Sequence, residues 1–366
     1  MRFWNFAGFI LALALLISCN NDDDLKCVNN YDQSVLLTNL ADNVIIPDYQ
    51  KLDESMDSLT LELSRFKNDP DITRLLQVRS AFSSAYLDFQ NVSQYQFGPA
   101  ELVSFRSAFN NFPLNTEELK ENISSGVYVL DDIERYDKGF PSLDYILYGV
   151  GASPSEIVDF LMANGEYIDY AEEVVQHMVE KLDFVLSEWR VEYRDQFIEN
   201  QGTNAGASLS LIVNNLNENY EISKRDRLGI PSGELTLNFP NPDLVEAPHS
   251  QLSLDLLKVS IRATIDFYLG RTDDGTNGEG LDDLLEFIGA EKDGRSLNEI
   301  IQEQYDVILQ TIDEIDGPLS IAVEQDSDDV IEAYAEISRQ VINTKTDMSS
   351  VMCITITYVD APSDTD

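Results

Sequence analysis

Histidine and basic side chains are scarce in this sequence. Its 366 residues contain two histidines, His177 and His249, and 24 lysines and arginines against 66 aspartates and glutamates, so the formal net charge is −42. Two distant histidines exclude the HExxH pattern of zinc peptidases, and no GxSxG, Walker or dinucleotide-binding motif is present. A chain this negative repels phosphate backbones, which excludes nucleic-acid binding. The charge favours cations, cationic ligands or simple solubility.

Cysteine is also rare, because the chain has only Cys19, Cys27 and Cys353. Residues 1–18 carry one basic residue and an apolar run that is too short for a comfortable membrane span. The run ends in LISC, which resembles the lipobox of bacterial lipoproteins. We therefore expect residues 1–18 to be a lipoprotein signal peptide and Cys19 to become a lipidated N-terminus. An ordinary signal peptide with a chance cysteine is the alternative.

The lipidated cysteine opens an acidic stretch, residues 19–34, in which Asn20 and Asn21 precede three aspartates. We interpret this stretch as a solvated tether, and it also resembles the surface-export signal of Bacteroidota lipoproteins. The expected location is the outer membrane of the cell envelope, with exposure at the cell surface as one alternative. In that oxidising compartment, Cys27 and Cys353 form a candidate disulfide.

Apolar residues recur at helical spacing through almost the whole chain. The clearest stripes are Tyr167, Tyr170, Val174, Met178, Leu182, Val185 and Trp189, and then Ile301, Tyr305, Ile308, Ile312 and Ile315. Spacings of three and four residues place each stripe on one face of a helix, where it packs into a core. Strand-like alternation is confined to residues 354–358, a segment too short to build a sheet. The sequence predicts an all-α protein.

Breaks between the stripes set the expected boundaries of the helices. Pro47 should kink a helix that runs from about residue 34 to residue 66. Asp71 is expected to cap the next helix, and Ser153 to cap another whose first residue is Pro154.

A longer break divides the chain into two helical bundles. Residues 230–250 contain four prolines and no helical stripe, so we interpret them as a connecting loop. The predicted bundles are residues 35–229 and residues 251–360, both built of long helices that kink where prolines occur.

Two polar segments offer weak metal sites. The loop at residues 272–280 is rich in Gly and Asp but fails the EF-hand pattern, so we interpret it as a polar loop before a helix. Glu173, His177 and Glu180 lie at helical spacing beside a core stripe. They form an alternative metal site only if that flank faces inward, as in di-iron bundles, and otherwise form a solvated face.

Several separate segments resemble the imelysin family, also called peptidase M75-like. They are QNVSQYQFGPA at residues 90–100, KGFPSLDYILYG at 138–149, AGASLSLIVNN at 205–215, VEAPHSQLSLDLL at 245–257, IDFYLGR at 265–271 and TKTDMSSVMCITITYVD at 344–360. They follow the family's order and cover about residues 35–360. The resemblance implies an all-helical envelope protein of two related bundles that is associated with iron uptake.

The family's Gly-x-His-x-x-Glu motif is degenerate in this sequence. Gly139 matches the glycine, but Pro141 stands in place of the histidine and Asp144 in place of the glutamate. Proline has no ring lone pair for a metal and no proton to transfer, so a role that needs the histidine is lost. Pro141 suits the first position of a short helix, and Asp144 then falls in the first turn. The stretch is either a buried helix start between the bundles or a ligand contact through Asp144, with Glu101 and Arg106 as further candidates.

Together, the lipobox, the loss of the motif histidine and the family resemblance predict a lipid-anchored envelope protein that binds a ligand without catalysis and contributes to iron uptake. The implied ligands are iron, another divalent metal or a haem-type molecule, and a transport partner is a further expectation. Two other functions stay open at this point. One is a structural or protein-binding module at the cell surface, and the other is a metallopeptidase, as the family's second name suggests.

Overall fold

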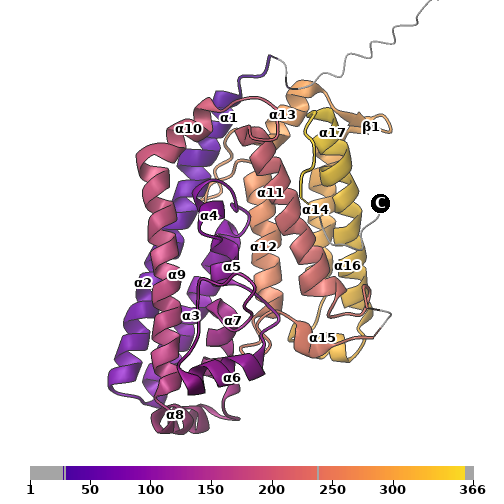
Figure 1. The fold of residues 1–366 in the computed structure, drawn as a ribbon. Helices are drawn as coiled ribbons and strands as arrows, with labels where there is room; N and C mark the ends of the chain where they lie inside the picture. The colour runs from indigo at the N-terminus through magenta and orange to yellow at the C-terminus, as the bar shows by residue number, and fades with distance from the viewer. Residues whose placement is uncertain (1–27, 29, 237–238, 359–366) are drawn as a thin grey trace, which may run out of the picture.

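Long amphipathic helices form the frame of the protein in a computed structural model that describes residues 28, 30–236 and 239–358 (Figure 1). The helices of the first part of the chain are α1 (Gln33–Asn39), α2 (Ile46–Asn68), α3 (Ile72–Val92), α4 (Pro99–Leu102), α5 (Phe105–Phe109), α6 (Thr116–Ser125), α7 (Gly139–Asp144), α8 (Pro154–Ala163), α9 (Glu166–Glu188) and α10 (Arg194–Glu199). Those of the second part are α11 (Ser208–Ile222), α12 (Ser253–Tyr268), α13 (Leu281–Ile288), α14 (Leu297–Asp313), α15 (Leu319–Glu324), α16 (Asp328–Val341) and α17 (Ser349–Val351). The predicted all-α class is confirmed.

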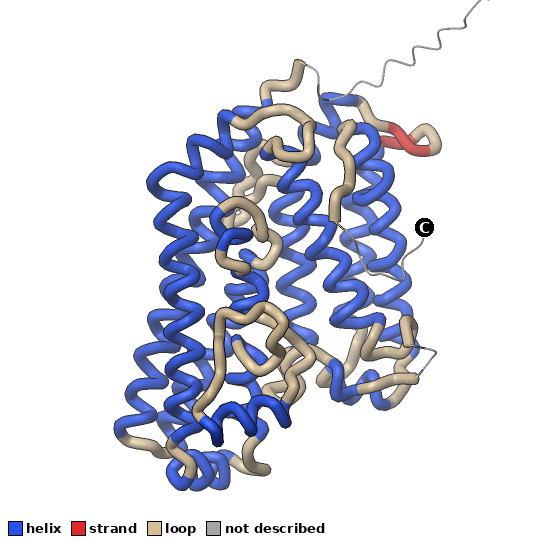
Figure 2. The backbone as a smooth tube through the Cα atoms, viewed as in Figure 1, coloured by secondary structure: helices blue, strands red, loops and turns tan. Residues whose placement is uncertain are grey.

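Extended structure is minimal in the described part of the chain (Figure 2). The only named strands there, β1 (Glu291–Lys292) and β2 (Arg295–Ser296), form one antiparallel pair. Residues 354–358 are irregular, and the Asn214 side chain holds them by accepting the Thr357 N–H at 2.7 Å. Within the described ranges, no helix is long and apolar enough to cross a membrane.

Short π-helical or 3₁₀ segments interrupt or extend the helices. They are η1 (Leu40–Ile45), η2 (Tyr145–Gly149), η3 (Trp189–Tyr193), η4 (Ser223–Gly229), η5 (Pro242–Leu244) and η6 (Ile342–Met348), of which η5 is 3₁₀. Segment η1 directly precedes α2, which has Pro47 in its first turn. Proline provides no N–H for the preceding turn, and a wider helical turn is a common response to such a gap. The predicted helix with a break at Pro47 is therefore observed as α1, η1 and α2.

The predicted caps are also observed. The Asp71 side chain accepts the Arg74 N–H at the start of α3, and the Ser153 side chain accepts the Glu156 N–H at the start of α8. Each cap satisfies one of the N–H groups that the first helical turn leaves without a partner.

Two groups of helices stand side by side (Figure 1). In the first group, α2 packs against α3 and α9; in the second, α14 packs against α16, and α11 contacts both α12 and α16. Helices α3 and α12 contact each other, so the seam between the groups follows this pair. The seam places polar residues of both groups in the protein interior.

Helix α7, which carries the degenerate motif, is fixed by aromatic side chains of the first group. Phe140 stacks on Tyr86 with ring centroids 4.4 Å apart, and its ring also lies 5.8 Å from Phe109. Phe109 in turn stacks on Phe89 at 5.3 Å. All four rings are buried. This aromatic packing sets the position of the motif next to the seam.

Candidate functional site

The backbone of α7 begins at a position that only glycine fits. Gly139 has φ of +68°, and a Cβ atom there would lie 2.2 Å from the Phe109 carbonyl oxygen. We had predicted Pro141 as the first residue of α7, but it is the third. The position still suits proline, because the first N–H groups of a helix have no partner within it. Proline therefore replaces the family's histidine without the loss of a helical hydrogen bond.

Asp144 is the last residue of α7, and the prediction that it lies in the first turn is wrong. Its two carboxylate oxygens accept the backbone N–H groups of His249 at 3.0 Å and Ser250 at 2.8 Å. The side chain is 1% exposed, and burial raises the pKa of its carboxyl group. Asp144 thereby ties α7 to the loop before α12.

The motif lines a pocket of about 650 Å³, which we call the motif pocket. Its polar lining includes Asp144, Asp243, His249 and Glu324, and the last three of these are exposed. They come from α7, from the connecting loop and from α15, so both halves of the chain form the walls. Carboxylate and imidazole groups are donors that iron accepts in proteins.

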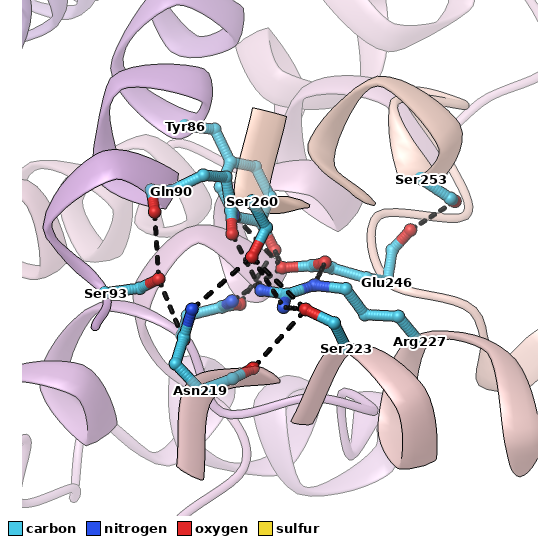
Figure 3. Close-up of polar contacts among 10 residues, drawn as sticks. Tyr86, Gln90, Ser93, Asn219, Ser223, Arg227, Glu246, Ser253 and Ser260 are labelled. Atoms are coloured by element: carbon cyan, nitrogen blue, oxygen red, sulfur yellow. Dashed lines mark hydrogen bonds and ion pairs between the residues drawn. The ribbon is translucent and has the colours of Figure 1, made fainter. Parts of the chain in front are cut away.

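Directly behind the motif, the seam contains a buried ion pair. Arg227 of η4 and Glu246 of the connecting loop are 2% and 1% exposed, and Arg227 Nε donates to Glu246 Oε2 at 2.5 Å. Figure 3 shows side chains of α3, α11, η4 and α12 gathered around this pair. The pair therefore connects segments that are distant in the sequence.

Polar neighbours satisfy most of the remaining hydrogen-bonding capacity of the pair. Glu246 Oε1 accepts from Asn110 Nδ2 at 2.6 Å and, at 3.3 Å each, from Tyr86 Oη and Gln90 Nε2. The other contacts are Arg227 Nη2 to Gln90 Oε1 at 2.7 Å, and Arg227 Nη1 to Ser223 Oγ at 2.8 Å and to Ser260 Oγ at 3.2 Å. We call these seven residues the seam network. Two opposite charges are tolerated inside a protein only when they contact each other and their remaining polar atoms are hydrogen-bonded in this way.

Of the two other motif neighbours that we predicted, Arg106 lies beside the seam. It lines a second pocket, of about 450 Å³, together with Asn110 and Arg227 of the seam network. We call this cavity the seam pocket. Glu101 is exposed on α4 and lines neither the seam pocket nor the motif pocket.

Glu173, His177 and Glu180 line a groove of about 860 Å³ along α9, away from the motif. Each has its own partner: Glu173 accepts from Tyr128 Oη at 2.7 Å, His177 Nε2 lies 3.1 Å from Asp131, and Glu180 accepts from a glutamine. Burial lowers the pKa of His177. Within the described ranges, no group of three or more His, Cys, Asp or Glu side chains is arranged to hold a metal ion.

The three cysteines lie mostly beyond the described ranges. Cys353 is disulfide-bonded. Cys27, its predicted partner, and Cys19, the predicted lipidation site, lie outside the described residues. The predicted signal peptide lies there too, as does most of the predicted tether, and all of these stay predictions.

The fold and the pockets define an all-helical protein with a polar seam between two helix groups. The chain belongs to the imelysin family, whose profile (peptidase M75, imelysin) matches residues 45–342.

Two solved structures share this fold. One is described as a putative iron-regulated protein A precursor from Parabacteroides distasonis ATCC 8503; it is 16% identical, the match covers 87% of this chain and 95% of that one, and the TM-score is 0.72. The other is an imelysin-like protein from Psychrobacter arcticum 273-4, with 13% identity, coverage of 89% and 97%, and a TM-score of 0.67. No curated protein matches the sequence.

The seam network was not predicted from the sequence. Arg227 lies in the segment KRDR, which has the composition of a solvated helix end, and Glu246 is one of 66 acidic residues. The available signal was Glu246 within VEAPHSQLSLDLL, one of the segments that carry the family resemblance. Nothing in the spacing of the two residues indicates that they meet.

Proposed function

We propose that the protein is a lipid-anchored envelope protein that binds an iron-bearing ligand in the motif pocket, without catalysis, and contributes to iron uptake. Iron is its cargo. The observation that carries this proposal is the construction of the motif pocket: the degenerate motif lies between the halves of the chain, and exposed Asp243, His249 and Glu324 stand around it. Among the described residues they do not form a complete metal-ion site of their own, so we propose that they contact iron that arrives with ligands of its own.

The charge of the protein supports a cationic ligand. With a formal net charge of −42, the chain attracts metal cations over a long range, and the motif pocket adds carboxylates of its own. One structural neighbour is described as an iron-regulated protein A precursor. At 16% identity that neighbour establishes a shared fold, and we extend its iron connection to this chain as a proposal.

A binding role also fits the chemistry of the motif. Pro141 has neither the lone pair nor the proton of the histidine that it replaces, so it can serve neither as metal ligand nor as general base. Asp144 already accepts two backbone N–H groups and acts as a positioning residue for the loop that carries His249. Direct contact between Asp144 and a ligand stays a prediction.

Calorimetric titration tests the binding function. The purified protein is titrated with ferrous iron, ferric citrate, haem and zinc, alongside His249→Ala and Glu324→Gln. We expect saturable binding of one iron-bearing ligand, weakened about tenfold or more in each variant, because each removes one donor from the pocket wall. The matched control is Glu303→Gln, which makes the same change at an exposed position outside the pocket.

Two results would contradict this function. Absence of saturable binding for all four ligands would redirect the search to a protein partner, and equal affinity in all variants would move the site elsewhere, with Glu173, His177 and Glu180 next. The anchor is tested separately by Cys19→Ser, which should move the protein from the membrane fraction to the soluble fraction of cells. Retention of this variant in the membrane fraction would exclude lipidation at Cys19 as the anchor.

A further inference from the structure

Three ionisable side chains that line the motif pocket have no counter-ion within the protein. Asp243, His249 and Glu324 are exposed, and within the described ranges none of these side chains forms a hydrogen bond or an ion pair. No lysine or arginine of the described chain lines the pocket. The potential at its mouth is therefore set by carboxylates, which repel an anionic ligand and attract a cationic one.

Most of the remaining wall of the motif pocket is apolar. Ten of its sixteen lining residues are apolar, and four of these are prolines. The side chains of Phe112, Leu114, Leu244 and Ile321 are not fully buried, and Ile321 is 41% exposed. A hydrated ion gains nothing from such a surface, whereas an apolar ligand body is removed from water when it covers the wall.

The size of the motif pocket also favours an organic ligand over a bare ion. Its volume of about 650 Å³ lies within the usual range for sites that hold drug-sized molecules. Within the described ranges, no three His, Cys, Asp or Glu side chains are arranged to hold a metal ion. Iron in this pocket must therefore keep most of its own ligands.

We infer that the motif pocket recognises iron within an organic chelate that has an apolar exterior and no net negative charge. This inference rests on the proposed function, because it names the class of that ligand. The apolar wall covers the body of the chelate, and Asp243 and Glu324 discriminate by its charge. Of the four ligands titrated above, haem alone has an apolar body, and its two propionates lie along one edge that can stay in solvent. Ferric citrate is polar and anionic and should not bind.

Calorimetry of the purified protein with a charge series of one chelate tests the inference. The probes are the iron(III) complexes of three 3-hydroxy-4-pyridinones that differ only in the group on the ring nitrogen, which is methyl, aminoethyl or carboxymethyl. The complexes are neutral, cationic and anionic in that order, and an excess of each pyridinone keeps the iron chelated. The cationic and neutral complexes should bind at one site per chain, and the anionic complex should bind about tenfold more weakly or not at all.

Reversal of one charge in the wall tests the electrostatic part. Glu324→Lys, at an exposed position of α15, should weaken binding of the cationic complex and strengthen binding of the anionic complex, so that their ratio changes about tenfold or more. A merely structural effect would weaken all three complexes alike. The matched control is Glu291→Lys, which makes the same change at an exposed position of β1 outside the pocket and should leave the ratio unchanged.

A second pair of variants tests the apolar part. Ile321→Ser removes hydrocarbon from the pocket wall at a partly exposed position, so it should weaken binding of the neutral complex severalfold and leave the fold intact. Ile342→Ser makes the same change at a 55% exposed position outside the pocket and should have no effect.

Three outcomes overturn the inference: no saturable binding of the neutral complex, an anionic complex that binds as tightly as the cationic one, or the same ratio in Glu324→Lys and Glu291→Lys. None of these contradicts the proposed function, which the titration with ferrous iron, ferric citrate and haem tests separately. Conversely, iron-free methyl pyridinone that binds as tightly as its neutral iron complex would contradict the proposed function, because the pocket would then not need iron.

Discussion

Replacement of Glu246 by glutamine tests whether the seam network holds the two helix groups together. Both oxygens of the Glu246 carboxylate act as hydrogen-bond acceptors. Oε2 accepts from Arg227 Nε, and Oε1 accepts from Asn110, Tyr86 and Gln90. Glutamine keeps the shape but has only one acceptor oxygen. In either orientation, its NH₂ group faces donors, and Arg227 loses its counter-charge while 2% exposed.

The magnitude follows from this burial. Removal of one partner from a buried ion pair costs about 3–5 kcal/mol, because the other charge stays buried without compensation. Typical domains unfold with a free energy of about 5–15 kcal/mol, so Glu246→Gln should remove a large share of the stability. The matched control is Glu303→Gln at the pair with Arg295, whose side chains are 64% and 51% exposed. That change should cost about 1 kcal/mol or less.

The assay is urea unfolding of the purified protein, followed by circular dichroism at neutral pH. Equal slopes of the unfolding transitions allow the difference in free energy to be read from the midpoints. A loss below about 1 kcal/mol in Glu246→Gln, or a loss equal to that of Glu303→Gln, would refute the argument that this pair is fully desolvated. Glu246→Gln should also increase amide exchange in the loop before α12, since that loop would lose one of its ties to the seam.

Two further predictions concern single residues. Gly139→Ala should lower the free energy of unfolding in urea by about 3 kcal/mol or more, because the new Cβ atom would clash with Phe109. The control Gly289→Ala shares φ of +68° but has free space around it, so it should lower that free energy only by the backbone strain of about 1–2 kcal/mol. Equal losses of stability in the two variants would exclude the clash. Burial raises the pKa of Asp48 to about 7 in the folded protein, so the neutral form favours folding. This contribution is present below about pH 4 and is lost as the pH rises through 7, so Asp48→Asn should gain stability relative to the wild type by up to about 1.4 kcal/mol per pH unit in that window. A pH-independent difference would contradict the raised pKa.

Local signals in the sequence were sufficient to predict the helices and their caps. The stripe from Tyr167 to Trp189 is α9 and η3, and Ser153 and Asp71 cap helices as their side chains allow. Such features depend on residues three or four positions apart, so a single sequence contains them. The position of Pro141 within α7 was missed by two residues, because the helix begins at a glycine with positive φ that offers no capping side chain.

The seam network and both pockets depend on contacts between distant segments. Glu246 meets Tyr86 and Asn110 across intervals of 160 and 136 residues, and no periodicity encodes such a pairing. A buried arginine is also rare enough that Arg227, in a charged segment, is expected at the surface. Only the packing of α12 against both α3 and η4 brings these polar groups together.

Because the family motif is degenerate here, we expect ligand recognition to depend mainly on residues outside the motif. Pro141 completes the first turn of α7, and Asp144 accepts the backbone N–H groups of residues 249 and 250. Both motif residues therefore have a structural role in this chain. The groups left to face a ligand are those that this arrangement presents: Asp243, His249 and Glu324 in the motif pocket. Because this set is mostly acidic, the motif pocket should select cationic ligands.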